Sequence, residues 1–339
     1  MKTPRTARRF FLPTKEAIFM HLRTWLIAVA LATSLVGNIA SAAPRNYLFT
    51  GSDELPRLAP LLKRPDIDGA QIVYTWKSLE PAKDHYDFKQ IEEDLRYLEG
   101  LDRHLFIQLQ DRFFEITHKG VPQYLQTEPV YGGGLVPQVD NPGEGKPEGY
   151  GWATQQWNPA VRERFQRLLA ALAKQFDGRV SGINLPETAI GIDIERDKTG
   201  FTCEKYFAAE LENAQFARKV FSKSHVVQYM NFWPCEWEND QKFMSRGFAF
   251  AKEHGIGLGG PDIVPYKKAQ MKNSYPFFNQ YKGKLSLVAM AVQEPTLTYS
   301  NPDTKKPFTR EEFVAFAQDY LGVNIIFWTA ASPWLKSAH

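Results

Sequence analysis

Two glutamates follow apolar segments of the chain, each in a neighbourhood that carries no other charge. Glu187 comes directly after "SGINLP" (181–186), and Glu294 comes directly after "LSLVAMAVQ" (285–293). Segments of this kind are typical of buried strands, so each glutamate is expected just past a strand end. Two carboxyl groups held near each other can serve as a proton donor and as a base or nucleophile. The sequence predicts such a pair if the fold joins these two strand ends.

Other polar and aromatic side chains also follow strand-like segments. Aromatic rings stack on the apolar faces of sugars, while amides and acids bond to hydroxyl groups. A rim of such residues would therefore suit a carbohydrate. The candidate binding residues are Trp76, Gln110, Asp111, Arg112, Asn184, Trp233, Asp262, Tyr266, Gln293 and Trp328.

The segments that must position these residues alternate in type along the chain. Eight short, mostly apolar runs read as strands, and longer amphipathic runs separate most of them. This alternation predicts an α/β protein with a parallel sheet, and eight strands predict a single-domain (β/α)8 TIM barrel. The strand candidates are 46–51, 70–75, 104–110, 180–184, 225–232, 255–260, 285–292 and 323–329.

Five helices are expected between the strands, and two features depart from a regular barrel. The helices cover 86–101, 158–176, 203–223, 238–254 and 309–322, and Asn158 with Pro159 marks the start of the second. The connection at 111–157 after the third strand is long and rich in Gly and Pro, which predicts a functional or disordered loop. The chain ends soon after the last strand, so the eighth helix is short or missing.

This layout resembles the TIM-barrel retaining glycoside hydrolases known as clan A. In that group a general acid/base Glu ends strand four, a nucleophile Glu ends strand seven, and a Trp at the end of strand eight forms a sugar platform. The resemblance implies these roles for Glu187, Glu294 and Trp328. The segment "YTWKSLEPAKDHYDFKQIEEDL" (74–95) is also similar to the strand-two region of such enzymes. A hydrolase of a polysaccharide or oligosaccharide, acting through two carboxylates, is the implied function.

Two other interpretations remain open, and a spacing that differs from the family pattern supports the first of them. In the family the acid/base usually follows Asn directly, whereas Leu185 and Pro186 separate Asn184 from Glu187 here. A non-catalytic carbohydrate-binding barrel is one alternative. The second is a hydrolase or lyase of different chemistry that uses Asp111 or Asp262 with a metal.

The N-terminal 42 residues are predicted to be an export signal. An apolar run (25–37) follows Arg23 and leads to Ala40-Ser41-Ala42, a small-x-small cleavage pattern, and the run is short for a membrane anchor. Met20 is an alternative start. The segment "ARRFFL" (7–12) resembles a twin-arginine signal, which leaves the export route undecided between the two pathways.

Removing these residues changes the charge of the protein. The whole chain carries +3, but residues 1–42 hold six Lys or Arg and one Glu, so residues 43–339 carry −2. A nearly neutral mature domain gives no support to a nucleic-acid partner. We expect an exported monomer, periplasmic or extracellular, that binds carbohydrate and has no stable membrane anchor.

The remaining sequence signals concern cysteines and cofactors. Cys203 and Cys235 are the only cysteines, and in an oxidising compartment they are either a disulfide or two buried thiols. The histidines lack metal-ligand spacing, and no nucleotide-binding or nucleophile-elbow motif is present. The sequence therefore predicts hydrolysis without a metal or other cofactor.

Overall fold

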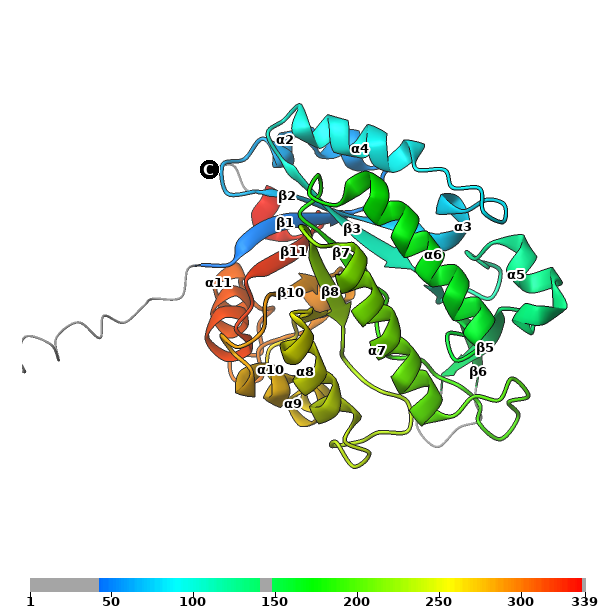
Figure 1. Cartoon of the computed structure of the whole chain (residues 1–339). Helices are drawn as coiled ribbons and strands as arrows, with labels where there is room; N and C mark the ends of the chain where they lie inside the picture. The colour runs from blue at the N-terminus through cyan, green and yellow to red at the C-terminus, as the bar shows by residue number, and fades with distance from the viewer. Residues whose placement is uncertain (1–42, 141–147, 337–339) are drawn as a thin grey trace, which may run out of the picture. The chain divides into compact units, whose positions relative to one another are not determined.

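The computed structural model describes residues 43–140 and 148–336. The predicted export signal at 1–42 lies outside the described residues. Eight parallel strands form a closed barrel in the order β1-β11-β10-β9-β8-β7-β3-β2. Figure 1 shows helices packed around the outside of this barrel. The predicted (β/α)8 fold is therefore confirmed. The barrel strands are β1 (Arg45–Thr50), β2 (Gly69–Thr75), β3 (His104–Gln110), β7 (Gly182–Leu185), β8 (His225–Tyr229), β9 (Gly257–Gly260), β10 (Val288–Val292) and β11 (Ile325–Thr329).

Alternation along each strand divides the core into an inner and an outer layer. In β10, Ala289 and Ala291 pack inside the barrel, while Val288, Met290 and Val292 join the layer under the helices. This is the period-two pattern of a strand that is buried on both faces. The inner layer consists of Tyr47, Phe106, Val227, Tyr229, Leu287, Ala289, Ala291, Ile325 and Phe327.

The five predicted helices are present, with some ends shifted. They are α4 (Lys89–Glu99), α6 (Pro159–Phe176), α7 (Cys203–Val220), α8 (Phe243–His254) and α11 (Arg310–Ala315), and α11 continues into the π-helix η5 (Phe316–Leu321). The Asn158 side chain accepts a 2.9 Å hydrogen bond from Ala160 N, which confirms the predicted cap of α6. α8 begins five residues later than predicted because Glu238, Asn239 and Lys242 adopt positive φ angles.

Shorter helices complete the outer layer. They are η2 (Leu55–Leu58), α2 (Ala59–Leu62), α3 (Trp76–Leu79), α9 (Lys268–Asn273), α10 (Tyr275–Gln280), η4 (Pro295–Thr298) and α12 (Pro333–Lys336). The four-residue α12 follows the last strand, in agreement with the predicted short eighth helix.

The long connection after β3 is more ordered than predicted. It contains α5 (Gln123–Thr127), η3 (Pro129–Tyr131) and a three-stranded antiparallel sheet of β4 (Arg112–Phe113), β6 (Glu148–Thr154) and β5 (Leu135–Asp140). At Gly151 a Cβ atom would lie 1.7 Å from Phe113 O, so only glycine allows β4 and β6 to approach this closely. Gly151 therefore permits tight strand pairing in a segment that the sequence interpretation took for loop.

The two cysteines form a disulfide, Cys203–Cys235, which is one of the two alternatives that the sequence leaves open. It joins the first residue of α7 to the loop after β8. None of the helices within 43–140 and 148–336 combines the length and the apolar character needed to span a bilayer.

Candidate active site

A cavity of about 470 Å³ lies where the barrel strands end, and we call it the central cavity. Gln108 and Gln110 reach it from β3, Thr75 from β2 and Tyr229 from β8. The carboxyl ends of barrel strands are the usual location of active sites in this fold. The full lining is Phe49, Val73, Thr75, Gln108, Gln110, Arg112, Phe113, Phe114, His118, Glu187, Tyr229, Pro261, Asp262 and Gln293.

Glu187 enters the central cavity from the turn after β7. Asn231 Nδ2, in the loop after β8, donates a 2.7 Å hydrogen bond to Glu187 Oε2. Burial raises the pKa of Glu187 above its ordinary value, although the positive charge of Arg112 and the bond from Asn231 oppose the shift. A carboxyl group with a raised pKa can keep its proton at a pH where an exposed glutamate would be ionised.

Asp262, in the loop after β9, is the second carboxylate of the central cavity. Burial raises its pKa, while a 2.9 Å hydrogen bond from Thr296 Oγ1 and the charge of Lys267 favour the ionised form. The negative charge of Asp262 in turn contributes to the raised pKa of Glu187. Ionisation of one carboxyl group makes ionisation of the other less favourable. One of the two can therefore keep its proton and act as an acid, while the other is ionised and acts as a base.

Glu294 lies in a neighbouring cavity of about 420 Å³, which we call the Glu294 cavity. Its side chain is exposed, whereas Gln293 lines both this cavity and the central one. Ala289 and Ala291 face the barrel interior, and Gln293 continues this alternation into the central cavity. Phe49 and Val73 are also shared, so the two cavities are contiguous. The catalytic role predicted for Glu294 stays a prediction.

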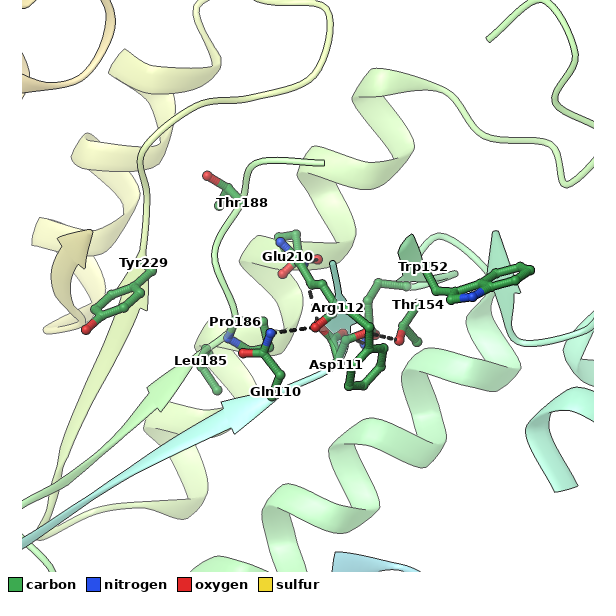
Figure 2. A network of polar contacts seen from close by, with 12 residues as sticks. Gln110, Asp111, Arg112, Trp152, Thr154, Leu185, Pro186, Thr188, Glu210 and Tyr229 are labelled. Atoms are coloured by element: carbon green, nitrogen blue, oxygen red, sulfur yellow. Dashed lines mark hydrogen bonds and ion pairs between the residues drawn. The ribbon is translucent and has the colours of Figure 1, made fainter. Parts of the chain in front are cut away.

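Arg112 lies at the edge of the central cavity and is held by buried acids (Figure 2). Its Nη2 lies 3.1 Å from Glu210 Oε1, and its Nε lies 3.4 Å from Asp111 Oδ1. Gln110 Nε2 donates to the carbonyl oxygen of Arg112 at 2.5 Å. Burial raises the pKa of Glu210 to about 7 despite the nearby guanidinium. The network fixes a positive charge near Glu187.

A third cavity, of about 460 Å³, also borders Glu187, and we call it the Trp233 cavity. It shares Glu187 and Phe114 with the central cavity, and Trp233 contributes to its wall. Trp233 is 3% exposed and packs against Phe207 and Phe243, and its Nε1 has no hydrogen-bond partner among the described residues. Trp233 therefore contributes one face of the cavity wall and does not form an open platform for a sugar ring.

Five of the predicted binding residues line none of these three cavities, so the structure does not place them at the candidate site. Trp328 is fully buried in the layer under the helices, where its Nε1 donates to Asn46 Oδ1 at 2.8 Å. Trp76 is 1% exposed, and its Nε1 donates to Glu80 Oε2 at 2.9 Å. Both indoles lie in the layer under the helices and not in the cavities. Successive side chains of a strand face opposite sides, so a place near a strand end does not show which side a residue faces.

The other three are Asp111, Asn184 and Tyr266. Asp111 is buried and accepts a 2.8 Å bond from Gln156 Nε2, in addition to its contact with Arg112. Asn184 is fully buried, and its Nδ2 donates to Leu185 O at 2.8 Å. Tyr266 is 56% exposed, and its ring contacts Phe316. Gln110, Arg112, Glu187, Asp262 and Gln293 are the predicted residues that the fold does bring together in the central cavity.

The sequence reasoning missed Asn231 and Gln108. Asn231 was included in the predicted strand 225–232, but β8 ends at Tyr229 and leaves Asn231 in the loop beside Glu187. Gln108 and Gln110 stand two residues apart near the end of β3, so they share the inward face. Two amide side chains on the same face of an otherwise apolar strand indicate a polar cavity, and this pattern is visible in the sequence.

Within 43–140 and 148–336, no three His, Cys, Asp or Glu side chains are grouped so that they could hold a metal ion.

Two solved glycosidases have an architecture similar to that of this chain. The barrel is similar to β-galactosidase from Bacillus circulans sp. alkalophilus, with a TM-score of 0.54, 12% identity and coverage of 86% of this chain and 51% of that one. It is also similar to endo-glycoceramidase II from Rhodococcus sp., with a TM-score of 0.51, 10% identity and coverage of 86% and 74%. The chain has the fold of the TIM-barrel glycoside hydrolases.

This likeness confirms the predicted resemblance at the level of the fold, since identities near 10% carry no residue roles. The chain spans about half the length of the β-galactosidase. No protein-family model matches the sequence, and a search of curated proteins finds no significant match.

Proposed function

We propose that this protein is a glycoside hydrolase whose general acid is Glu187. The observation that carries the proposal is the pairing of Glu187 with Asp262 in one polar cavity at the mouth of the barrel. Three glutamines, Gln108, Gln110 and Gln293, line the same cavity and offer both donors and acceptors to sugar hydroxyls. The shared fold with solved glycosidases supports the same assignment.

Glu187 suits the acid because its pKa is raised by burial. In the reaction its proton passes to the glycosidic oxygen while the bond from that oxygen to the anomeric carbon breaks. Asn231 can hold the carboxyl group in place throughout, since its amide donates to Oε2 and leaves Oε1 for the substrate. After departure of the leaving group, the ionised Glu187 can accept a proton from water.

The second carboxylate, which acts as base or nucleophile, has two candidates. Asp262 is favoured by position, because it shares the central cavity with Glu187, and Thr296 and Lys267 partly offset the rise in its pKa that burial causes. Glu294 is the nucleophile that the family resemblance implies, and it lines the contiguous cavity. Separate substitutions of Asp262 and Glu294 distinguish these two candidates.

The proposed substrate contains an oligosaccharide or polysaccharide. The central cavity and the Glu294 cavity are contiguous, so together they can hold more than one sugar unit. We also propose that the protein is exported, and the disulfide between Cys203 and Cys235 supports this because disulfides persist in oxidising compartments.

A non-catalytic carbohydrate-binding protein is the second candidate. One observation favours it: an amide, Gln293, continues the inward face of β10 in the central cavity, while the neighbouring carboxylate Glu294 is exposed. An amide can bind a hydroxyl group but cannot act as a nucleophile or base in this reaction.

The test is hydrolysis of a panel of oligosaccharides and 4-nitrophenyl glycosides by the full chain. We expect turnover by the wild-type protein and a loss of about 10²- to 10⁴-fold in kcat for Glu187→Gln, the range for removal of a general acid. Glu195→Gln is the matched control, because Glu195 is exposed in the same loop and lines none of the three cavities. Saturable sugar binding without turnover would favour the non-catalytic candidate and exclude the hydrolase.

A further inference from the structure

Two exposed aromatic rings lie beside Glu187, and we call them the aromatic pair. Phe114, which follows β4, is 47% exposed, and Tyr150 of β6 is 36% exposed. Their ring centroids are 5.8 Å apart, and the ring planes meet at 34°. Phe114 lines both the central cavity and the Trp233 cavity, and Tyr150 lines the Trp233 cavity. Large aromatic side chains that stay accessible at the edge of a cavity are typical of a binding site.

The tryptophans that the sequence suggested for sugar binding are not open to stacking in the same way. Trp76 and Trp328 are buried under the helices, and Trp233 is 3% exposed. Among the Phe, Tyr and Trp side chains that line the three cavities, Phe114 and Tyr150 are the most exposed. The aromatic surface that a sugar could reach beside Glu187 is therefore provided mainly by the antiparallel sheet inserted after β3.

Backbone contacts fix this inserted sheet relative to Glu187. Val139 N in β5 donates to Gly191 O at 3.1 Å, which joins the sheet to the loop that carries Glu187. At Gly191 a Cβ atom would lie 2.2 Å from Val139 O, so the close approach depends on glycine. β6, which carries Tyr150, pairs with both β4 and β5. The aromatic pair is therefore held in place beside Glu187 by the fold itself.

The positions of the carboxylates assign the two sides of the bond to be cleaved. Glu187 lines both the central cavity and the Trp233 cavity, whereas Asp262 lines the central cavity and Glu294 the cavity beyond it. Neither candidate for the second carboxylate lines the Trp233 cavity. Because the second carboxylate acts at the anomeric carbon, the sugar with this carbon belongs in the central cavity. The leaving half of the substrate then lies in the Trp233 cavity.

We propose that the aromatic pair binds the leaving half of the substrate and that this half is a second sugar unit. The inference rests on the proposed function and makes the bond between two sugars the one that is cleaved. An aromatic face packs against the apolar face of a sugar ring. Since Phe114 and Tyr150 are both partly exposed, a sugar stacked on them can keep its hydroxyl groups in water. The proton of Glu187 passes to the bridging oxygen, so the second sugar leaves with a hydroxyl group, and water supplies the hydroxyl group on the anomeric carbon.

The first experiment compares a disaccharide with the methyl glycoside of the same sugar and anomer. Both leaving groups are alcohols, so the effect of a variant on the ratio of the two kcat/KM values reports contacts of the leaving sugar. We expect the full chain to prefer the disaccharide by about tenfold, and Tyr150→Ala to reduce that preference about 3- to 10-fold, the effect of losing one ring contact.

Tyr150 is the best position for this test because it lines the Trp233 cavity and not the central one. Tyr150→Phe keeps the ring and should keep most of the preference, whereas Tyr150→Leu keeps an apolar side chain without a flat ring and should lose it. Trp237→Ala is the control, since Trp237 is 51% exposed and lines none of the three cavities. A ratio unchanged in Tyr150→Ala and Tyr150→Leu, or hydrolysis of aryl glycosides without hydrolysis of any disaccharide, would overturn the proposal and leave the hydrolase assignment intact.

A binding measurement separates the two proposals. Cellotriose, xylotriose, laminaritriose and mannotriose are each titrated by calorimetry into the full chain carrying Glu187→Gln, which should hold a substrate uncleaved. We expect saturable binding of at least one trisaccharide, which an added Tyr150→Ala weakens and an added Trp237→Ala does not. Such binding, in a protein whose wild type hydrolyses no glycoside, would support the aromatic pair and overturn the proposed function. Binding of none of the four, or binding that Tyr150→Ala leaves unchanged, would overturn the role of the aromatic pair alone.

Discussion

Asn231 holds Glu187 across two neighbouring strands of the barrel, through a 2.7 Å hydrogen bond from Nδ2 to Oε2. Glu187 follows β7 and Asn231 follows β8, and these strands pair in parallel from Gly182 to Leu185. The register of this pairing places the two loops side by side. The bond both orients the carboxyl group and opposes the rise in its pKa that burial causes.

The pH dependence of turnover should respond to Asn231. Glu187 acts as an acid only while protonated, so the activity is lost as the pH rises through its pKa. Asn231→Ala removes a donor that favours the ionised form, which raises the pKa further. The alkaline limb of the kcat/KM profile should therefore move to higher pH. Asn279→Ala is the control, because Asn279 is exposed and donates to Tyr320 O instead. An alkaline limb that moves to lower pH would contradict the role of Glu187 as acid.

Asp262 and Glu294 can be ranked as the second carboxylate by kinetics. Asp262→Asn should reduce kcat by about a hundredfold or more, because the cavity of Glu187 would lose its base or nucleophile. Glu294→Gln should cost less, since its exposed side chain lines the contiguous cavity. Steady-state kinetics on one substrate decide between them. A larger loss for Glu294→Gln would assign the nucleophile as the family resemblance implies.

The stability of the barrel should depend strongly on Arg112. Arg112→Met leaves Asp111 and Glu210 buried without their cation, and removal of one partner from a buried charge cluster costs about 3–5 kcal/mol. Urea unfolding followed by tryptophan fluorescence measures the change. Arg167→Ala should leave the midpoint nearly unchanged, because its contact with Glu163 is exposed. Equal midpoints for both variants would show that the buried cluster contributes little.

The disulfide should stabilise the loop after β8 against unfolding. Its two cysteines are 32 residues apart, and closing a loop of this size in the unfolded chain is worth about 2–4 kcal/mol. Replacement of both cysteines by serine should lower the Tm, and a reducing agent should lower the Tm of the wild-type protein alone. If the reducing agent lowered the Tm of the double variant by the same amount, the reductant would act on something other than this disulfide.

Local patterns in the sequence were enough to predict the barrel and some of the residues that line the candidate site. The eight apolar runs become the eight barrel strands, since short buried strands that alternate with amphipathic helices leave few other arrangements. Glu187 was placed at the site because it follows the fourth predicted strand, and the carboxyl ends of barrel strands form the usual active-site face. The cysteine pair was left open between a disulfide and two thiols, and the structure shows a disulfide.

The tertiary structure decided which side chains face the cavities. Trp328 and Gln293 both come from the ends of predicted strands, yet Trp328 lies under the helices and Gln293 lines the central cavity. A shift of one residue reverses the face of a strand, and the sequence does not show where the last paired residue falls. The pairing of Glu187 with Asp262 likewise depends on strand order, because β8 lies between β7 and β9. Residue types and spacing determined that a polar site exists at the barrel mouth, and the register of the strands decided which residues form it.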